Sequence, residues 1–404
     1  MFSIDLSPLR NYPNYRWLYL GQMISFFGSM ITYVAIPFQM YELTHSTVHV
    51  GMLGIVQLIP LVISGFWGGA LADSFDRRKL AAMTEVASAM GNILLLAFTV
   101  SGSQNFWFLY ALSGLMAIFK GLERPALEAL TQQLIQKKDI PKVSTLQSLK
   151  TTGGMILGPA IGGVLIASIG LKATYLVDFF TYVVSIFCLW KLKDIPVLKE
   201  RRKASLSSIT DGFRYAMKRP DLMGTYVVDM ASMTFAFPNP LFPALAASLG
   251  DTGKLGWLYS APAIGAFLGS LTSSWTHKYL RHGKGITIAA LGWCVGIFFF
   301  GWSTSFYWGL FFLGVAGWAD MISGIFRATM WNETIPEEYR GRLASVEMIS
   351  YSSGPLMGNT FMGFLSDARG PSQALMMGGL IGGVSVVILG FGIRYFWHYK
   401  AYRE

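Results

Sequence analysis

Long apolar stretches alternate with short polar stretches along almost the whole chain of 404 residues. Each apolar stretch has about 20 residues or more, which is the length that a helix needs to cross the hydrocarbon core of a bilayer. We therefore predict twelve membrane-spanning helices, at roughly residues 15–41, 49–72, 79–101, 106–130, 143–169, 171–191, 221–246, 255–276, 285–303, 306–331, 343–366 and 372–396.

One longer polar segment separates six predicted helices from the other six. We expect an N-terminal six-helix bundle over residues 1–192, a cytoplasmic linker over 193–220 and a C-terminal six-helix bundle over 221–404. The halves also repeat each other at a displacement of about 200 residues, because Gly51 corresponds to Gly256 and Gly158 to Gly354. The sequence thus predicts an all-α membrane protein of two pseudo-symmetric bundles around a central cavity.

Composition agrees with this prediction. Hydrophobic residues make up 53% of the chain and charged residues 13%, about half the charged share of a typical soluble domain. The first apolar stretch is too long for the apolar region of a signal peptide, so we interpret it as the first membrane helix. The two cysteines, Cys188 and Cys294, lie inside apolar stretches, which favours buried thiols over a disulfide or a metal site.

The distribution of basic residues predicts the orientation. Most of the 32 Lys and Arg residues fall in the loops on one side of the predicted helices, and the loops on the other side hold only Lys172, Lys254 and Arg369. Short cytoplasmic loops collect basic residues, so we expect both termini in the cytoplasm. The net charge of +10 then reflects topology and contact with anionic lipids, and not nucleic-acid binding.

The sequence carries no motif of an enzyme. A phosphate-binding loop, a His-Glu-x-x-His pair and a nucleophile elbow are all missing from it. We therefore predict that the protein is not an enzyme and that it needs no cofactor and no metal.

The loop between the second and third predicted helices contains Gly69, Asp73, Arg77 and Arg78. Their spacing resembles the signature Gly-x-x-x-Asp-Arg/Lys-x-Gly-x-Arg-Arg/Lys of the major facilitator superfamily. Ser74 departs from it where a base is usual, and Asp76 where a glycine is usual. The resemblance implies that these charges bias an inner gate. We expect two further arginines near cytoplasmic helix ends to join the same charge network, namely Arg124 and Arg327.

Further segments resemble the enterobactin (siderophore) exporter and related drug-efflux-like members of that superfamily. They include residues 44–51, 242–246 and 256–262. The resemblance implies a monomeric transporter of the bacterial inner membrane that exports a siderophore or similar small molecule to the periplasm by alternating access. It also implies that proton antiport drives the export. Multidrug or macrolide efflux by the same fold is the first alternative, and a non-transporting receptor or scaffold is the second.

Several ionisable residues lie deep inside the predicted helices, where a charge costs about 3 kcal/mol or more. Asp320, Asp229 and Asp178 are candidate proton carriers, because a buried carboxylate can bind and release a proton near neutral pH. A permanent salt bridge with Lys120, which would only fix the helix rotation, is the competing interpretation of Asp320. For two other deep residues, Glu85 and Lys150, we expect a structural ion pair.

A cavity for a large planar ligand needs aromatic and hydrogen-bonding side chains. The candidates for its lining are Lys120, Tyr226, Phe235, Tyr259 and Trp318. Tryptophan and tyrosine near helix ends are also typical of the interfacial belt, so any single aromatic residue has this simpler interpretation.

The seventh predicted helix has three prolines close together near its outer end. Pro238, Pro240 and Pro243 each remove a backbone donor, so we expect the helix to break there. Irregular backbone at membrane depth is tolerated where it meets protein or a water-filled cavity. We therefore assign this break to an outer gate.

Overall fold

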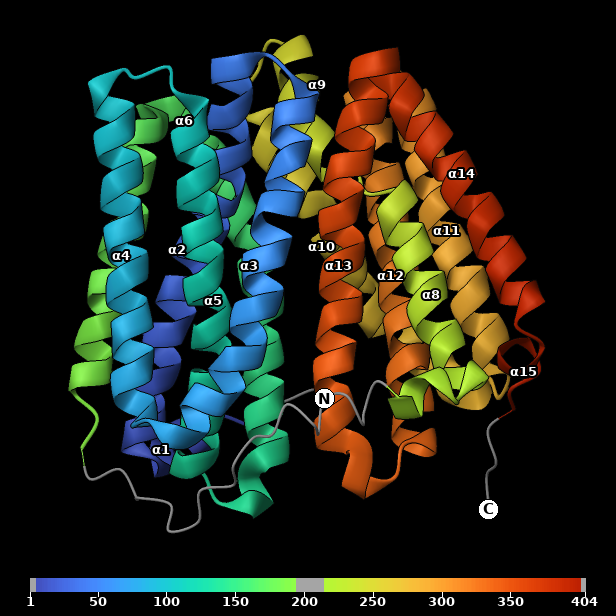
Figure 1. The fold of residues 1–404 in the computed structure, drawn as a ribbon, viewed down its shortest axis with the longest axis horizontal. Coiled ribbons are helices and arrows are strands. Elements are labelled where there is room, and N and C mark those ends of the chain that lie inside the picture. The colour runs from blue at the N-terminus through green and yellow to red at the C-terminus, as the bar shows by residue number, and fades with distance from the viewer. Residues whose placement is uncertain (1–4, 194–213, 401–404) are drawn as a thin grey trace. The chain divides into compact units, whose positions relative to one another are not determined.

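The structure, a computed structural model, describes residues 5–193 and 214–400, and for residues 66–74, 137 and 337–349 it describes the backbone alone. The described parts are helical throughout (Figure 1). Their α-helices are α1 (Ser7–Asn11), α2 (Pro13–Thr44), α3 (Thr47–Ser74), α4 (Arg77–Ser101), α5 (Phe106–Leu134), α6 (Ile140–Trp190), α8 (Pro220–Phe235), α9 (Phe242–Ser248), α10 (Lys254–Thr272), α11 (His282–Trp302), α12 (Phe306–Thr334), α13 (Glu337–Arg369), α14 (Pro371–Gly392) and α15 (Arg394–Trp397). Three short 3-10 helices are η1 (Lys137–Asp139), η2 (Asn239–Leu241) and η3 (Ser273–Lys278).

Among the described residues, eight of these helices are long and apolar enough to cross a membrane. They confirm a multi-pass membrane protein. The predicted linker, 193–220, lies for the most part outside the described residues.

The chain divides into two compact units. Unit 1 contains residues 1–43, 59–204 and 251–256, and in it α4 packs against both α5 and α6. Unit 2 contains residues 44–58, 205–250 and 257–404, and in it α11 packs against α12 and α14 while α8 packs against α13 and α14. Helices α3 and α10 therefore each contribute to both units.

Two glycines form tight connections between neighbouring helices. Gly170 has φ 78° and ψ 171°, and it divides α6 into two helices that correspond to the fifth and sixth predicted ones. Gly370 has φ 80° and ψ 157°, and it alone separates α13 from α14. This combination of angles is essentially restricted to glycine. The same one-residue connection thus occurs in both halves of the chain, at the repeat distance that the sequence predicts.

The seventh predicted helix is broken, as its prolines predict. Helix α8 ends at Phe235, and the chain then passes through η2 before α9 begins at Phe242. The backbone N–H of Ala236 still bonds to Ser232 O, but Pro238 and Pro240 have no N–H with which to continue the helix. The role of this break in a gate stays a prediction.

Pairs of glycines allow helices to approach closely at two equivalent points. In unit 2, a Cβ added to Gly51 of α3 would lie 3.0 Å from Gly363 Cα of α13, and Thr47 Oγ1 donates to Gly363 O at 3.1 Å. In unit 1, a Cβ added to Gly163 of α6 would lie 2.6 Å from Gly256 Cα of α10. Neither crossing has room for a larger side chain, which is typical of close helix packing in membranes.

Candidate functional site

The signature loop leads into the start of α4. Gly69 and Asp73 belong to the last turns of α3, whose side chains lie outside the described residues. Arg77 Nη1 donates to Ala129 O of α5 at 3.2 Å. Arg78 donates from Nε to Leu189 O at 3.0 Å and from Nη2 to Trp190 O at 2.9 Å. Arg78 thus binds the carbonyl end of α6, where a cation also complements the helix dipole.

Asp76, which occupies the usual glycine position of the signature, caps α4. Its side chain accepts hydrogen bonds from the backbone N–H of Arg78 at 3.0 Å and of Lys79 at 3.3 Å. An aspartate in this position satisfies two N–H groups that a helix start leaves without partners. The departure from the signature therefore has a structural reason.

The two arginines that we expected in the same charge network have different surroundings. Arg124 Nε lies 3.0 Å from Glu128 Oε1, one turn further along α5, and both side chains are exposed. Arg327, in contrast, is largely buried and binds acids within unit 2. The structure thus places the pair on a surface and Arg327 in an interior. Their contribution to a gate stays a prediction.

Arg327 of α12 lies between two of the proposed proton carriers. It forms an ion pair with Asp229 of α8 through Nη1, and its Nη2 lies 3.5 Å from Asp320 Oδ1 on its own helix. Asp229 is almost fully buried, whereas Asp320 is half-buried. The guanidinium stays protonated at any pH that a protein tolerates, so it compensates the charge of both carboxylates. The alternative pairing of Asp320 with Lys120 stays a prediction.

The third proposed carrier, Asp178, belongs to a buried column of polar side chains in unit 1. The column has three levels, and each level joins one residue of α2, one of α4 and one of α6. We call it the polar ladder, and its levels are Ser25, Glu85 and Ser185; Thr32, Asn92 and Asp178; and Gln39, Thr99 and Tyr175. In the last level, Gln39 Nε2 donates to Thr99 Oγ1 and Tyr175 OH donates to Gln39 Oε1, both at 2.8 Å.

The first level surrounds Glu85. Ser25 Oγ donates to Glu85 Oε1 at 3.3 Å, and Ser185 Oγ donates to the same oxygen at 2.8 Å. The other oxygen, Oε2, accepts no hydrogen bond from any residue that the structure describes. Glu85 is fully buried.

The middle level surrounds Asp178, which is also fully buried. The Thr32 hydroxyl hydrogen-bonds Asp178 Oδ2 and lies 3.2 Å from Asn92 Oδ1. Thr181 Oγ1 lies 3.0 Å from Asp178 Oδ1. Among the described residues, no cation lies within ion-pair distance of either Asp178 or Glu85. Both acids are therefore held by uncharged partners.

The expected ion pair of Glu85 with Lys150 is wrong. Lys150 Nζ instead donates to Gln22 Oε1 of α2 at 2.9 Å and lies 5.9 Å from the centre of the Phe26 ring. The side chains that hydrogen-bond Glu85 are instead Ser25 of α2 and Ser185 of α6. Residue depth alone, which was the basis of the expectation, does not determine which helix faces turn toward each other.

The proposed cavity residues have the following surroundings. Tyr226 lies in a hydrophobic core cluster and its ring centre is 5.5 Å from that of Trp331. Tyr259 OH donates to Asn239 O at 3.2 Å. The remaining contacts are Phe235 with Phe361, Trp318 Nε1 with Thr272 Oγ1 at 2.9 Å, and a half-buried position on α5 for Lys120. The packing of Tyr226 favours a structural role, and substrate contact by the set stays a prediction.

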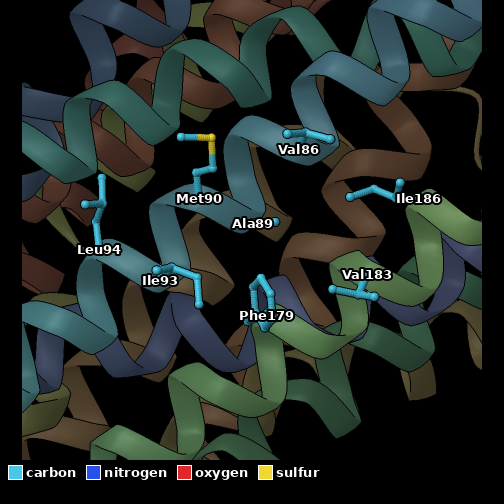
Figure 2. A pocket seen from close by; sticks show the side chains of 8 residues that line it. All are labelled: Val86, Ala89, Met90, Ile93, Leu94, Phe179, Val183 and Ile186. Atoms are coloured by element: carbon cyan, nitrogen blue, oxygen red, sulfur yellow. The ribbon is translucent and has the colours of Figure 1, made fainter.

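A shallow groove of about 320 Å³ lies between α4 and α6 (Figure 2). Its lining is entirely apolar: Val86, Ala89, Met90, Ile93, Leu94, Phe179, Val183 and Ile186. Four of these residues directly follow ladder positions of the same two helices, so the groove lies on a different helix face: Val86, Ile93, Phe179 and Ile186. Met90 and Val183 are well exposed, which suits contact with lipid tails and not with a polar substrate.

Sequence reasoning missed the polar ladder, although a signal for it exists. The residues Ser25, Thr32 and Gln39 of α2 are spaced by seven, as are Glu85, Asn92 and Thr99 of α4. Seven residues are close to two helical turns, so this spacing puts polar groups on one stripe of an otherwise apolar helix. Two parallel polar stripes in one bundle predict contact between them.

Comparison with known proteins agrees with this architecture. The profile of the family described as transmembrane secretion effector matches residues 3–395. The chain is 27% identical to the enterobactin exporter EntS of Shigella flexneri and 26% identical to that of Escherichia coli (strain K12). Each alignment extends over 397 residues and covers 97% of this chain and 95% of the relative.

A solved structure shows the same fold at low identity. The crystal structure of a bacterial homologue of the human lysosomal transporter Spinster has a TM-score of 0.77 at 13% identity, and the match covers 99% of this chain and 100% of that one. The family profile covers nearly the whole chain. The homologues and the structural neighbour are membrane transporters and not enzymes, and the chain belongs to the transmembrane secretion effector family of the major facilitator superfamily.

Proposed function

We propose that the protein is a secondary active transporter that exports a siderophore, or a similar small molecule, from the cytoplasm to the periplasm in exchange for protons. The similarity to enterobactin exporters over 97% of the chain carries this proposal.

Basic groups within unit 1 support an acidic substrate such as a carboxylate or catecholate siderophore. Lys120 is half-buried on α5, and Lys150 is held by the neutral Gln22 amide. Among the described residues, no carboxylate lies within ion-pair distance of either lysine, and a partly desolvated cation attracts an anion more strongly than a solvated cation does. Multidrug or macrolide efflux is the second candidate function, which the aromatic content of the chain favours.

Transport into inverted membrane vesicles tests the proposal. Vesicles with an acidic lumen should accumulate tritiated enterobactin, and a protonophore should abolish the accumulation. Accumulation of a tritiated macrolide without enterobactin would instead support drug efflux. If the vesicles accumulate neither compound, transport is refuted and the receptor or scaffold alternative takes its place.

The role of the basic groups has its own test. We expect Lys120→Met to raise the KM for enterobactin, whereas Lys172→Met, on an exposed side chain, should leave the KM unchanged. Equal KM values for the two variants would contradict an anionic contact at Lys120.

The orientation requires a separate experiment. A reporter enzyme that is active only in the cytoplasm should work when it is fused after Lys203 and fail when it is inserted between Ser101 and Asn105. The opposite pattern would place both termini in the periplasm and contradict the proposed orientation.

A further inference from the structure

The polar ladder contains two buried carboxyl groups that neither the signature loop nor the Arg327 ion pairs account for. Glu85 and Asp178 lie in adjacent levels, on α4 and α6. Adjacent levels are seven residues apart along α2 and along α4, or about 10 Å at 1.5 Å per residue. The three levels together span about 21 Å, most of the ~30 Å thickness of a bilayer core.

Charged partners distinguish these two acids from those of unit 2. Asp229 and Asp320 share Arg327, so a proton that binds them competes with a permanent positive charge. Glu85 and Asp178 are held by the neutral groups of Ser25, Ser185, Thr32 and Thr181. A hydroxyl group can donate to a carboxylate and can also accept from a protonated carboxyl group, so these partners suit both protonation states.

The unpartnered oxygen of Glu85 indicates where a proton would bind. Oε2 is buried and accepts no hydrogen bond from the described residues. A carboxylate charge on such an oxygen is costly, because burial removes it from bulk solvent and no described residue donates a hydrogen bond to it. When a hydronium ion gives its proton to this oxygen, an O–H bond forms, water is left and the charge disappears.

The titratable and charged groups around the two acids come from α5 and α6. The negative charge of Glu123 on α5 acts on Glu85, and the positive charge of Lys120 on α5 acts on Asp178. The other such groups near the pair are Lys150, Tyr175, Tyr182 and Cys188 of α6. The repulsion between Glu85 and Glu123 adds to the cost of a second negative charge there.

Hydroxyl groups also lie between the two levels. Ser88 follows Glu85 by almost one turn of α4, and Tyr182 lies between Asp178 and Ser185 on α6. Both side chains are buried. These positions fill the interval that a proton must cross between Asp178 and Glu85.

We propose that Glu85 and Asp178 form a proton-binding site inside unit 1, which carries the coupling proton along the polar ladder while the Arg327 acids of unit 2 stay ion-paired. The role in coupling rests on the proposed proton antiport. The binding of a proton does not, so the two ideas can fail separately.

Infrared difference spectroscopy tests proton binding directly. Purified protein in lipid nanodiscs is moved by a pH step across the neutral range, and the carbonyl-stretch band of protonated carboxyl groups is recorded. We expect Glu85→Gln and Asp178→Asn each to remove part of this band. The matched control is Glu128→Gln, which changes an exposed acid of α5 and should leave the band intact.

If a variant does not fold, the infrared band of the wild-type protein alone still tests the proposal. No protonated-carboxyl band in the wild type, or a full band in both variants, overturns the proposal. A band that disappears in Asp229→Asn and remains in Glu85→Gln also overturns it, because the proton would then bind in unit 2.

Transport measurements then separate the proposal from the proposed function. In inverted vesicles, Glu85→Gln and Asp178→Asn should lose enterobactin accumulation driven by a pH gradient and keep exchange of enterobactin without a gradient. If the wild type shows no gradient-driven accumulation, proton antiport fails while the infrared result on the site still holds. If the wild type accumulates enterobactin and both variants do so at the same level, the proposed carrier role fails and antiport stands.

Discussion

Replacing Arg327 by methionine should destabilise the protein far more than removing an arginine from an exposed pair. Arg327 and Asp229 side chains are 13% and 6% exposed, so Arg327→Met leaves a buried carboxylate without its cation. Breaking a buried pair in this way costs about 3–5 kcal/mol. Asp320, at 37% exposure and 3.5 Å from Arg327, adds only about 1 kcal/mol or less.

The matched control is Arg124→Met. Its pair with Glu128 joins residues one turn apart on a single helix, and the side chains are 55% and 62% exposed, so the loss should be about 0.3–0.5 kcal/mol. The two arginine variants should thus differ roughly tenfold in the free energy of unfolding that they lose. Unfolding in mixed micelles with increasing SDS, followed by the fluorescence of the 12 tryptophans, measures this quantity.

A double variant checks the cause. Asp229→Asn combined with Arg327→Met removes the uncompensated charge, so it should recover most of the stability that Arg327→Met loses. If Arg327→Met and Arg124→Met have equal effects, or if the double variant is no more stable than Arg327→Met, the buried ion pair does not have the role argued from its burial.

Three further predictions concern other parts of the chain. Gly170→Ala should lower the free energy of unfolding by about 1–3 kcal/mol. Backbone strain is the only cause, because an added Cβ would meet nothing within 4 Å. The control Gly392→Ala has equally open surroundings and an ordinary φ, so it should not lower the free energy of unfolding. Hydrogen bonds from Ser7 and from the nearby Lys142 lower the pKa of the solvent-exposed Asp5 from 3.8 to about 2. The contact with Lys142 should therefore be complete above pH 3.8 and be lost as the pH falls through about 2. The carboxyl-carbon NMR titration of Asp5 should show this midpoint, and Lys142→Met should return it only part of the way, since Ser7 has the larger effect; a midpoint near 3.8 in the wild type contradicts the prediction. Arg77→Ala should reduce enterobactin transport at near-normal expression, and wild-type transport at every pH would show that the role implied by the signature does not apply here.

The helical membrane fold could be predicted from the sequence because apolar length is a strong, local signal. A stretch of about 20 apolar residues has few stable alternatives to a membrane helix. The break after Phe235 could also be predicted, because Pro238 and Pro240 lack the donors that a helix needs. The cause of each of these features lies within the segment itself.

The side-chain partners could not be predicted in the same way. Glu85 and Lys150 were expected to pair because their depths match, but the rotation of α4 and α6 turns Glu85 toward Ser25 and Ser185. The partner of Arg327, Asp229 of α8, also could not be predicted from its position along α12. Such contacts depend on the relative rotation of several helices, which the spacing of single residues does not determine.

The one-residue connections at Gly170 and Gly370 limit how the helices that they join can move. A longer loop has spare length and lets two helices slide past each other along their axes. A single residue has none, so each of these hairpins can change its opening angle but not the register of its two helices at the connected end. During any conformational change, the two helices of each hairpin can therefore only rotate about their connected end. A tag or label inserted at either glycine would add the missing length and should uncouple the pair, whereas the segment from Gly102 to Asn105 already has that length.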